Sequence, residues 1–303
     1  MAKKALDFFH LNSMTKTDVQ IYSTITSIVG KQYEYNDCVH EVTHLTEYKP
    51  GYCVGIVETT KMKNIPPKKD NISKKVSGLD LNKTEGIAFA NVFLYHKDLR
   101  ILIYEMNKNG MYASKFIDFI NNPDPATKND ITEDVVFTKN AYKKMMKMVT
   151  VKTFDFKITV PYGVKIEHLN ETGPMGAIFK SCKGSDANTI ECSLALSHER
   201  GKGLNLRDII SRTSALLKIN KTGQNGVIVD KIEVMGYEKD PDNPNKTNRI
   251  LLDMIMSKFR GTINLTDQKI LVDLQITDRK TEIMKLFKKA NPDLIEMYGN
   301  TEK

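Results

Sequence analysis

Residues 85–120 read EGIAFANVFLYHKDLRILIYEMNKNGMYASKFIDFI, and this stretch decides the fold class. Two runs within it, 87–95 and 99–106, are apolar at both odd and even positions, a pattern typical of strands buried on both faces. The polar residues 96–98 predict a hairpin between these strands, and the Asn-Lys-Asn-Gly sequence at 107–110 offers residues that adopt positive φ where the chain leaves the sheet. An amphipathic helix should follow and end before Pro123, because proline cannot continue a helix.

The segments on either side of this unit extend the same mixture of strands and helices. On the N-terminal side, the sequence predicts an edge or early strand at 3–11, a helix at 15–29, strands at 33–48 and 52–60, and a lysine-rich loop broken by prolines. On the C-terminal side it predicts strands at 131–138, 149–160, 190–197 and 224–237, and helices at 140–148, 206–219 and 278–289. The mixed run 250–265 fits a long strand bent at Gly261. In the last helix, the residues expected to point outward are Arg279, Lys280, Lys285, Lys288 and Lys289.

Residues 121–130, NNPDPATKND, are rich in Pro, Asn and Asp and lack an apolar anchor, which is typical of a domain boundary. We therefore predict an N-terminal α+β domain at 1–125 and a C-terminal α+β domain at 126–303. The abundance of hairpin-like strand pairs argues against a doubly wound parallel sheet. The predicted fold class is α+β, with two lobes that contain mixed or largely antiparallel sheets flanked by helices.

Length and composition narrow the class of protein. The chain has 303 residues, 40% of them hydrophobic, which is enough for two ordinary domains with cores of their own. No run approaches the roughly 20 apolar residues of a membrane span, and the N-terminus lacks the apolar core of a signal peptide, so we expect a cytoplasmic protein without membrane insertion. The four cysteines, Cys38, Cys53, Cys182 and Cys192, form no C-x-x-C pair, which favours reduced thiols over a zinc knuckle or a redox motif.

The charge balance points toward a polyanionic partner, although charge alone favours an ordinary solvated surface. The formal net charge is +8, from 45 Lys and Arg against 37 Asp and Glu, although an ordinary solvated surface could carry the same excess. Basic residues gather in the proline-broken loop and in the helices predicted at 140–148 and 206–219. The candidate DNA-contact residues are Lys68, Lys69, Lys74, Lys75, Lys143, Lys144, Lys147, Arg207 and Arg212. If the loop and the first helix share one face, neutralising about five phosphates gives a log–log salt slope near −4.5.

One string matches a catalytic pattern. His40-Glu41-Val42-Thr43-His44 satisfies H-E-x-x-H, the zinc-peptidase spacing in which one helical turn brings both histidines to the same metal. The surrounding residues favour extended structure, however, and four residues of a strand rise about 13 Å, beyond the reach of one zinc ion. The interpretation as two surface or half-buried histidines is therefore favoured, and no metal ligand is assigned. Two other carboxylate–lysine strings, at 58–61 and 155–157, are interpreted as chance pairings in a lysine-rich chain.

The order of elements resembles a known group of proteins. An EG-initiated apolar strand, a hairpin, a second strand, N-x-x-G and a helix, followed by VKTFDFKITVP at 151–161, resemble the RexA-type phage-exclusion proteins and related phage and bacterial anti-phage defence domains. The pattern is also distantly similar to the DNA-binding subunit of the Kiwa system. The resemblance covers residues 85–161 and implies a sequence-tolerant double-stranded DNA-binding protein, a homodimer, that acts in phage defence or phage exclusion without catalysis. It supplies no motif of functional residues, so the site candidates come from the basic clusters alone.

Two functions therefore compete. The first is a non-catalytic protein without a cofactor that binds the phosphate backbone of double-stranded DNA and acts as a homodimer. A co-encoded partner protein is a further candidate partner. The alternative is a metal-dependent hydrolase, either a zinc peptidase-like enzyme that uses His40, Glu41 and His44 or a nuclease. The sequence has no G-x-S-x-G elbow, P-loop or G-x-G-x-x-G turn, and this favours the binding protein.

Overall fold

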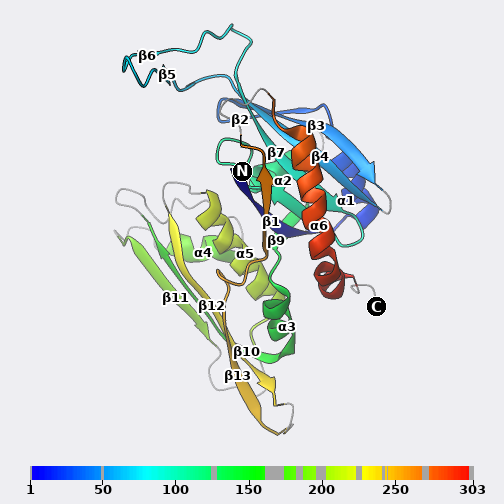
Figure 1. Ribbon diagram of the computed structural model, residues 1–303. Helices are drawn as coiled ribbons and strands as arrows, with labels where there is room; N and C mark the ends of the chain where they lie inside the picture. Colours follow the sequence, from blue (N-terminus) through cyan, green and yellow to red (C-terminus); the bar gives the residue numbers. More distant parts are fainter. Residues whose placement is uncertain are drawn as a thin grey trace. The chain divides into compact units, whose positions relative to one another are not determined.

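A computed structural model describes residues 2–48, 51–123, 128–160, 174–181, 187–195, 203–222, 227–240, 243, 245–267 and 273–299. Within these ranges the chain contains six helices and 14 strands, and the strands make up three antiparallel sheets. This mixture of elements (Figure 1) confirms the predicted α+β class. The division into two lobes stays a prediction. None of the helices in these ranges combines the length and the apolar content that crossing a membrane requires.

Contacts within the chain divide it into two compact units, Met1–Glu133 with Arg260–Lys303, and Asp134–Phe259. These units differ from the predicted ranges 1–125 and 126–303, because the chain returns to the first unit after residue 259. There β14 (Arg260–Leu265) pairs with β1 (Ala2–Asn12), so β1 lies inside the sheet and not at its edge. Strand pairing of this kind joins segments remote in sequence, which a local composition shift cannot reveal.

The first unit is built on a sheet with the strand order β14-β1-β8-β7-β4-β3-β2. A further strand, β9, lies outside this order and pairs with β1. The remaining strands are β2 (Gln32–Tyr35), β3 (Cys38–Tyr48), β4 (Tyr52–Lys61), β7 (Ile87–His96), β8 (Ile101–Glu105) and β9 (Thr132–Val135). The predicted hairpin of 87–106 is confirmed as the antiparallel pair β7–β8, with Phe93 opposite Tyr104. Both strands are buried over most of their length, as their two-sided apolar pattern predicts.

Helices cover both faces of this sheet. On one face, Phe93 contacts Phe116 of α2 (Ala113–Asn121), and Tyr95 contacts Tyr22 of α1 (Asp18–Thr26), with ring centroids 4.8 and 6.3 Å apart. On the opposite face, the His96 ring lies 5.5 Å from Phe287 of α6 (Ile276–Tyr298). Since successive residues of a strand point to opposite faces, α1 and α2 form one layer and α6 the other.

A buried ion pair ties α6 to the sheet. Arg279 was expected to point outward, but the structure buries it against Glu105 of β8, whose side chain is fully buried. Glu105 Oε2 also accepts the Val92 backbone N–H at 3.1 Å, and Arg279 Nε donates to the Leu274 carbonyl at 2.8 Å. The prediction was wrong because a lysine-rich helical face gives no sign that one of its cations has a buried partner in a distant strand.

Helix α6 also extends beyond the predicted end at 289. It continues through Pro292 to Tyr298, although proline removes one helical hydrogen bond. Leu294 is fully buried and Met297 nearly so. Packing of this last apolar stripe therefore outweighs the loss of that hydrogen bond.

Two strand predictions need correction. The run 250–265 is not one bent strand: β13 (Thr247–Asp253) ends in a turn where Asp253 Oδ1 accepts the N–H groups of Ile255 and Met256, and β14 then joins a different sheet. The run 33–48 is likewise two strands, β2 and β3. Asn36 and Asp37 separate them with φ values of 50° and 59°, a left-handed conformation that Asn and Asp tolerate.

The second unit contains a four-stranded sheet in the order β11-β10-β12-β13. Its other elements are β10 (Met148–Thr159), β11 (Thr189–Ala195), β12 (Ile228–Lys239), α3 (Lys139–Lys147), α4 (Pro174–Ser181) and α5 (Leu206–Thr222). Phe154 and Phe156 of β10 are fully buried, whereas the alternate residues Thr153 and Asp155 are only half-buried. Helix α5 packs on β12. This sheet therefore has one apolar face and one polar face.

Candidate nucleic-acid interface

A basic excursion lies between β4 and β7, at residues 61–86, and we call it the lysine arm. It contains a short antiparallel ribbon of β5 (Lys68–Lys69) and β6 (Val76–Ser77), in which Lys68 lies opposite Ser77 and Lys69 opposite Val76. Figure 1 shows the ribbon at the far end of a long loop that leaves the sheet and returns to it. All residues from 67 to 85 are exposed, so these lysines are open to a partner.

The turn of the lysine arm is organised by an acidic side chain. Asp70 Oδ1 accepts the backbone N–H groups of Ile72 and Ser73 at 2.8 and 3.3 Å, and Oδ2 accepts the Ser73 hydroxyl at 2.8 Å. These hydrogen bonds lower the pKa of the Asp70 carboxyl, and the one from the Ile72 backbone has the largest effect. The carboxylate is thus used to shape the turn, in which Lys74 takes a φ of 57°.

The lysine arm holds a large share of the net charge. It contains seven lysines and three carboxylates, a net charge of +4, which is half of the +8 of the whole chain. Lys68 lies 3.6 Å from Asp80, but both side chains are more than half exposed, and such a pair is weak in water. The Glu85 carboxylate accepts hydrogen bonds from the backbone N–H and the side-chain amide of Asn82, at 2.9 Å each. A ligand with several phosphates can therefore compete for most of the amines.

The predicted contact residues fall into two groups. Lys68, Lys69, Lys74 and Lys75 share the lysine arm of the first unit. Lys143, Lys144 and Lys147 are exposed on α3 of the second unit, where Arg207 and Arg212 lie on α5. Arg212 Nε donates to Asp208 at 2.8 Å. The proposed common face of the arm and α3 stays a prediction, because the two groups belong to different units.

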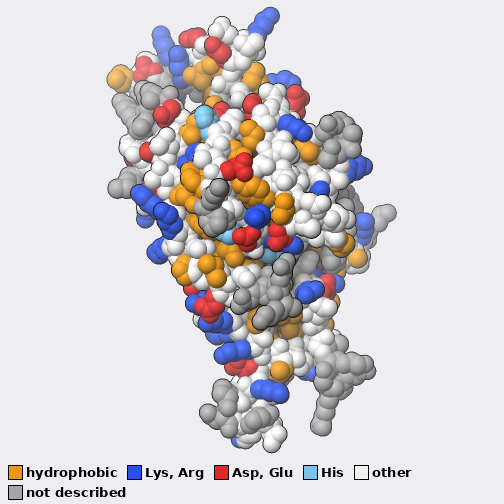
Figure 2. Space-filling model, turned by 90° about the vertical axis from the view of Figure 1, so that its right-hand side faces the viewer, with side chains coloured by type: hydrophobic (Ala, Val, Ile, Leu, Met, Phe, Trp, Pro, Cys, Tyr) orange, Lys and Arg blue, Asp and Glu red, His pale blue; other side chains and the backbone are white. Residues whose placement is uncertain are grey.

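On the face that Figure 2 draws, the described surface is mixed in charge. Figure 2 shows one face of the molecule, on which Lys and Arg side chains are interspersed with Asp and Glu and do not gather into one basic patch. On the polar face of the second unit's sheet, Lys231 pairs with Glu233 at 3.0 Å. These alternating charges are typical of an ordinary solvated surface.

The H-E-x-x-H string forms no helix. It lies in β3, where His40 is buried and its Nδ1 is 2.9 Å from the Thr59 hydroxyl. His44 has a φ of 51° at an irregularity of the β3–β4 pairing, and its Nε2 lies 3.5 Å from Glu58. The two histidines therefore have different partners. No group of three or more His, Cys, Asp or Glu side chains in the described ranges is arranged to hold a metal ion.

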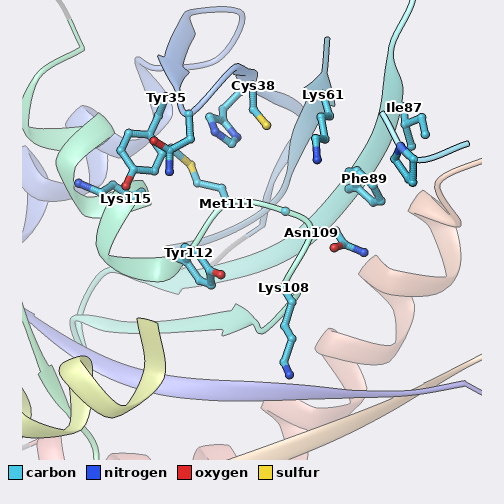
Figure 3. Close-up of a pocket in the computed structure, with 14 residues that line it drawn as sticks. Tyr35, Cys38, Lys61, Ile87, Phe89, Lys108, Asn109, Met111, Tyr112 and Lys115 are labelled. Carbon is cyan, nitrogen blue, oxygen red and sulfur yellow. The ribbon is translucent and has the colours of Figure 1, made fainter. Parts of the chain in front are cut away.

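A cavity of about 480 Å³ opens at the foot of the lysine arm (Figure 3). Its walls come from the β2–β3 turn, the end of β4, the start of β7 and the loop that leads into α2. The lining residues are Tyr35, Asn36, Cys38, His40, Lys61, Pro66, Ile87, Phe89, Lys108, Asn109, Gly110, Met111, Tyr112 and Lys115. Sequence reasoning missed this site, because its residues come from four separate segments and 107–110 carried only a turn signal.

A buried asparagine holds the wall of this cavity in place. Asn91 of β7 donates from Nδ2 to the Glu105 carbonyl at 2.9 Å, and its Oδ1 accepts the Met111 N–H at 3.1 Å. Gly110 packs directly against this amide: a Cβ added there would lie 2.0 Å from Asn91 Oδ1. Position 110 therefore requires glycine, because the backbone there lies too close to the Asn91 side chain to leave room for a Cβ atom.

We expect Gly110→Ala to lower the free energy of unfolding by about 2–3 kcal/mol, because displacing Asn91 leaves buried polar groups without partners. Gly78→Ala is the matched control, since no heavy atom lies within 4 Å of a Cβ at that position. It should change stability by less than about 0.5 kcal/mol. Urea unfolding followed by circular dichroism measures both, and equal stabilities of the two variants would contradict the packing described here.

Comparison of the chain with models of protein families finds no match, and comparison with curated proteins finds none either.

Proposed function

We propose that the protein binds double-stranded DNA through its phosphate backbone, with little preference for sequence. The observation that carries this proposal is the lysine arm, an exposed two-stranded ribbon with lysines at both sides of its turn. A ribbon of two strands fits the major groove of B-DNA. Each lysine that neutralises a phosphate releases counterions, and this release favours binding on any sequence.

The choice of lysine over arginine supports binding with little preference for base sequence. The basic residues of the arm are all lysines, which act as mobile point charges. Specific contacts with guanine usually depend on the planar, bidentate fork of arginine. Binding led by lysine should therefore respond strongly to salt and weakly to base sequence.

Affinity for unrelated duplexes tests this proposal. At 0.1 M salt, 20-base-pair duplexes of different composition should bind with affinities that agree within about threefold, because no base edge is read. A protein that reads its site loses about 1–3 kcal/mol for each mismatched base pair. A duplex preferred by a hundredfold or more would contradict the tolerant mode.

The biological role proposed for this activity is phage exclusion or phage defence, with the protein acting in the cytoplasm as a homodimer. The support for this role is the resemblance of residues 85–161 to RexA-type proteins. Expression in a phage-sensitive bacterial host should lower plaque formation, and the protection should disappear when the arm lysines are replaced. Unchanged plaque numbers with the wild-type protein would remove the proposed role while leaving DNA binding open to its own test.

A further inference from the structure

The cavity at the foot of the lysine arm has the size and lining of a small-molecule site. Its volume of about 480 Å³ falls within the range of ligand pockets, roughly 300–1,000 Å³. The described residues that line it include three lysines, three aromatic side chains and a histidine, but no Asp or Glu. A cavity with this composition is suited to an aromatic ligand that carries negative charge.

Of the three lysines among the described lining residues, Lys61 is the best placed to contact a ligand. Figure 3 shows Lys61 pointing from the end of β4 toward the loop at 108–112, whereas Lys108 points away from the other labelled side chains. Lys115 is already engaged: its Nζ lies 2.7 Å from Asp118 and 4.7 Å from the centre of the Tyr35 ring. An anionic group bound here would therefore contact Lys61.

Aromatic side chains form much of the remaining wall. Phe89 on β7 is half-buried, and Tyr112 stands at the start of α2 (Figure 3). The flat faces of such side chains stack on nucleic-acid bases, and each stacked base contributes about 1–3 kcal/mol to binding. The combination of these rings with Lys61 matches the two parts of a nucleotide, its base and its phosphate.

A buried histidine forms part of the wall. His40 lines the cavity, and its Nδ1 lies 2.9 Å from the Thr59 hydroxyl. Burial lowers the pKa of His40, and a hydrogen bond with the Tyr35 backbone opposes this shift. The ring is therefore held in place by neighbouring residues.

From these observations we infer that the cavity binds a nucleotide unit, with its base against Phe89 and its phosphate at Lys61. The unit can be a free mononucleotide or one nucleotide of a single strand, since both present the same base and phosphate. This site is separate from the lysines of the ribbon, so it does not rest on the proposed binding of duplex DNA.

Calorimetric titration with adenosine 5′-monophosphate tests the site. We expect saturable binding that Lys61→Met weakens by about tenfold or more, because a charge-assisted hydrogen bond to the phosphate is lost. Adenosine lacks the phosphate, so its weaker binding should be the same in the wild type and in this variant. Phe89→Leu should weaken both ligands, with the fold checked by circular dichroism. The matched control is Lys288→Met, which removes the same charge from an exposed residue of α6 that lies outside both the cavity lining and the lysine arm.

A ten-nucleotide deoxyadenosine strand distinguishes the two sources. If the ligand is part of a nucleic acid, this strand should bind more tightly than the mononucleotide and lose affinity in Lys61→Met but not in Lys288→Met. If the ligand is a free nucleotide, the mononucleotide should bind at least as tightly as the strand. Absence of binding by either probe at millimolar concentration, or binding unaffected by Lys61→Met and Phe89→Leu, would overturn the inference. Duplex binding by the same protein is measured separately, so failure of one site does not imply failure of the other.

Discussion

Replacing Lys68, Lys69, Lys74 and Lys75 together with glutamine should weaken binding to duplex DNA by roughly 100-fold or more at 0.1 M salt. Each lysine that contacts a phosphate adds about 0.9 to the magnitude of the log–log salt slope, so the slope should become shallower by about 3.6. The loss should be the same on every sequence, because phosphate contacts carry no base information. Fluorescence anisotropy with a labelled duplex at several salt concentrations measures the affinity and the slope together.

A matched variant separates the position of the charges from their number. Lys3, Lys285, Lys288 and Lys289 are exposed in the same unit but lie on β1 and α6, outside the arm. Their replacement with glutamine removes the same total charge and should change affinity by less than about threefold. If both quadruple variants lose affinity equally, the net charge and not the arm determines binding. If neither loses affinity while the fold is intact, the arm does not bind DNA.

Arg279→Met should lower the free energy of unfolding by about 3–5 kcal/mol, the largest effect on stability that we expect from one substitution. The substitution leaves Glu105 buried without its ion-pair partner, and the cost of an uncompensated buried charge exceeds the loss of the pair itself. Urea unfolding followed by circular dichroism gives the free energy and shows whether the transition remains cooperative.

The double variant Glu105→Gln with Arg279→Met tests this explanation. Glutamine keeps an acceptor for the Val92 N–H but buries no charge, so the double variant should recover at least half of the lost stability. Lys285→Met, on the exposed side of the same helix, should change stability by less than about 0.5 kcal/mol. A double variant as unstable as Arg279→Met alone would show that packing of the arginine, and not the unpaired carboxylate, explains the loss.

Local patterns in the sequence predicted the central unit well. The β7–β8 hairpin and α2 follow from two-sided apolar runs, a polar break and a proline, all of which act over a few residues. The return of β14 to the first unit could not be predicted in this way. Its pairing with β1 joins residues more than 250 positions apart, and no local signal specifies it.

The candidate functional residues show the same difference between local sequence signals and contacts of distant segments. The lysines of the arm stand out in the sequence because they crowd a short proline-broken segment, and the structure places them in one exposed excursion. Their contact with DNA stays a prediction. The cavity was missed because the segments that contain Lys61, Phe89 and Tyr112 come to line one cavity only through the pairing of β4 with β7 and the packing of the following loop. The burial of Arg279 was missed for the same reason, since Glu105 lies in a strand 174 residues earlier.

The most direct test of the proposed function is the salt dependence of wild-type binding to a random-sequence duplex. Between about 50 and 200 mM salt, the logarithm of the association constant should fall linearly with the logarithm of the salt concentration, with a slope of about −3.6 or steeper. A slope in this range means that at least four phosphates are neutralised, as the lysine arm requires. Absence of binding at 50 mM salt, or a slope shallower than about −1, would contradict the proposal that this protein binds DNA through its lysines.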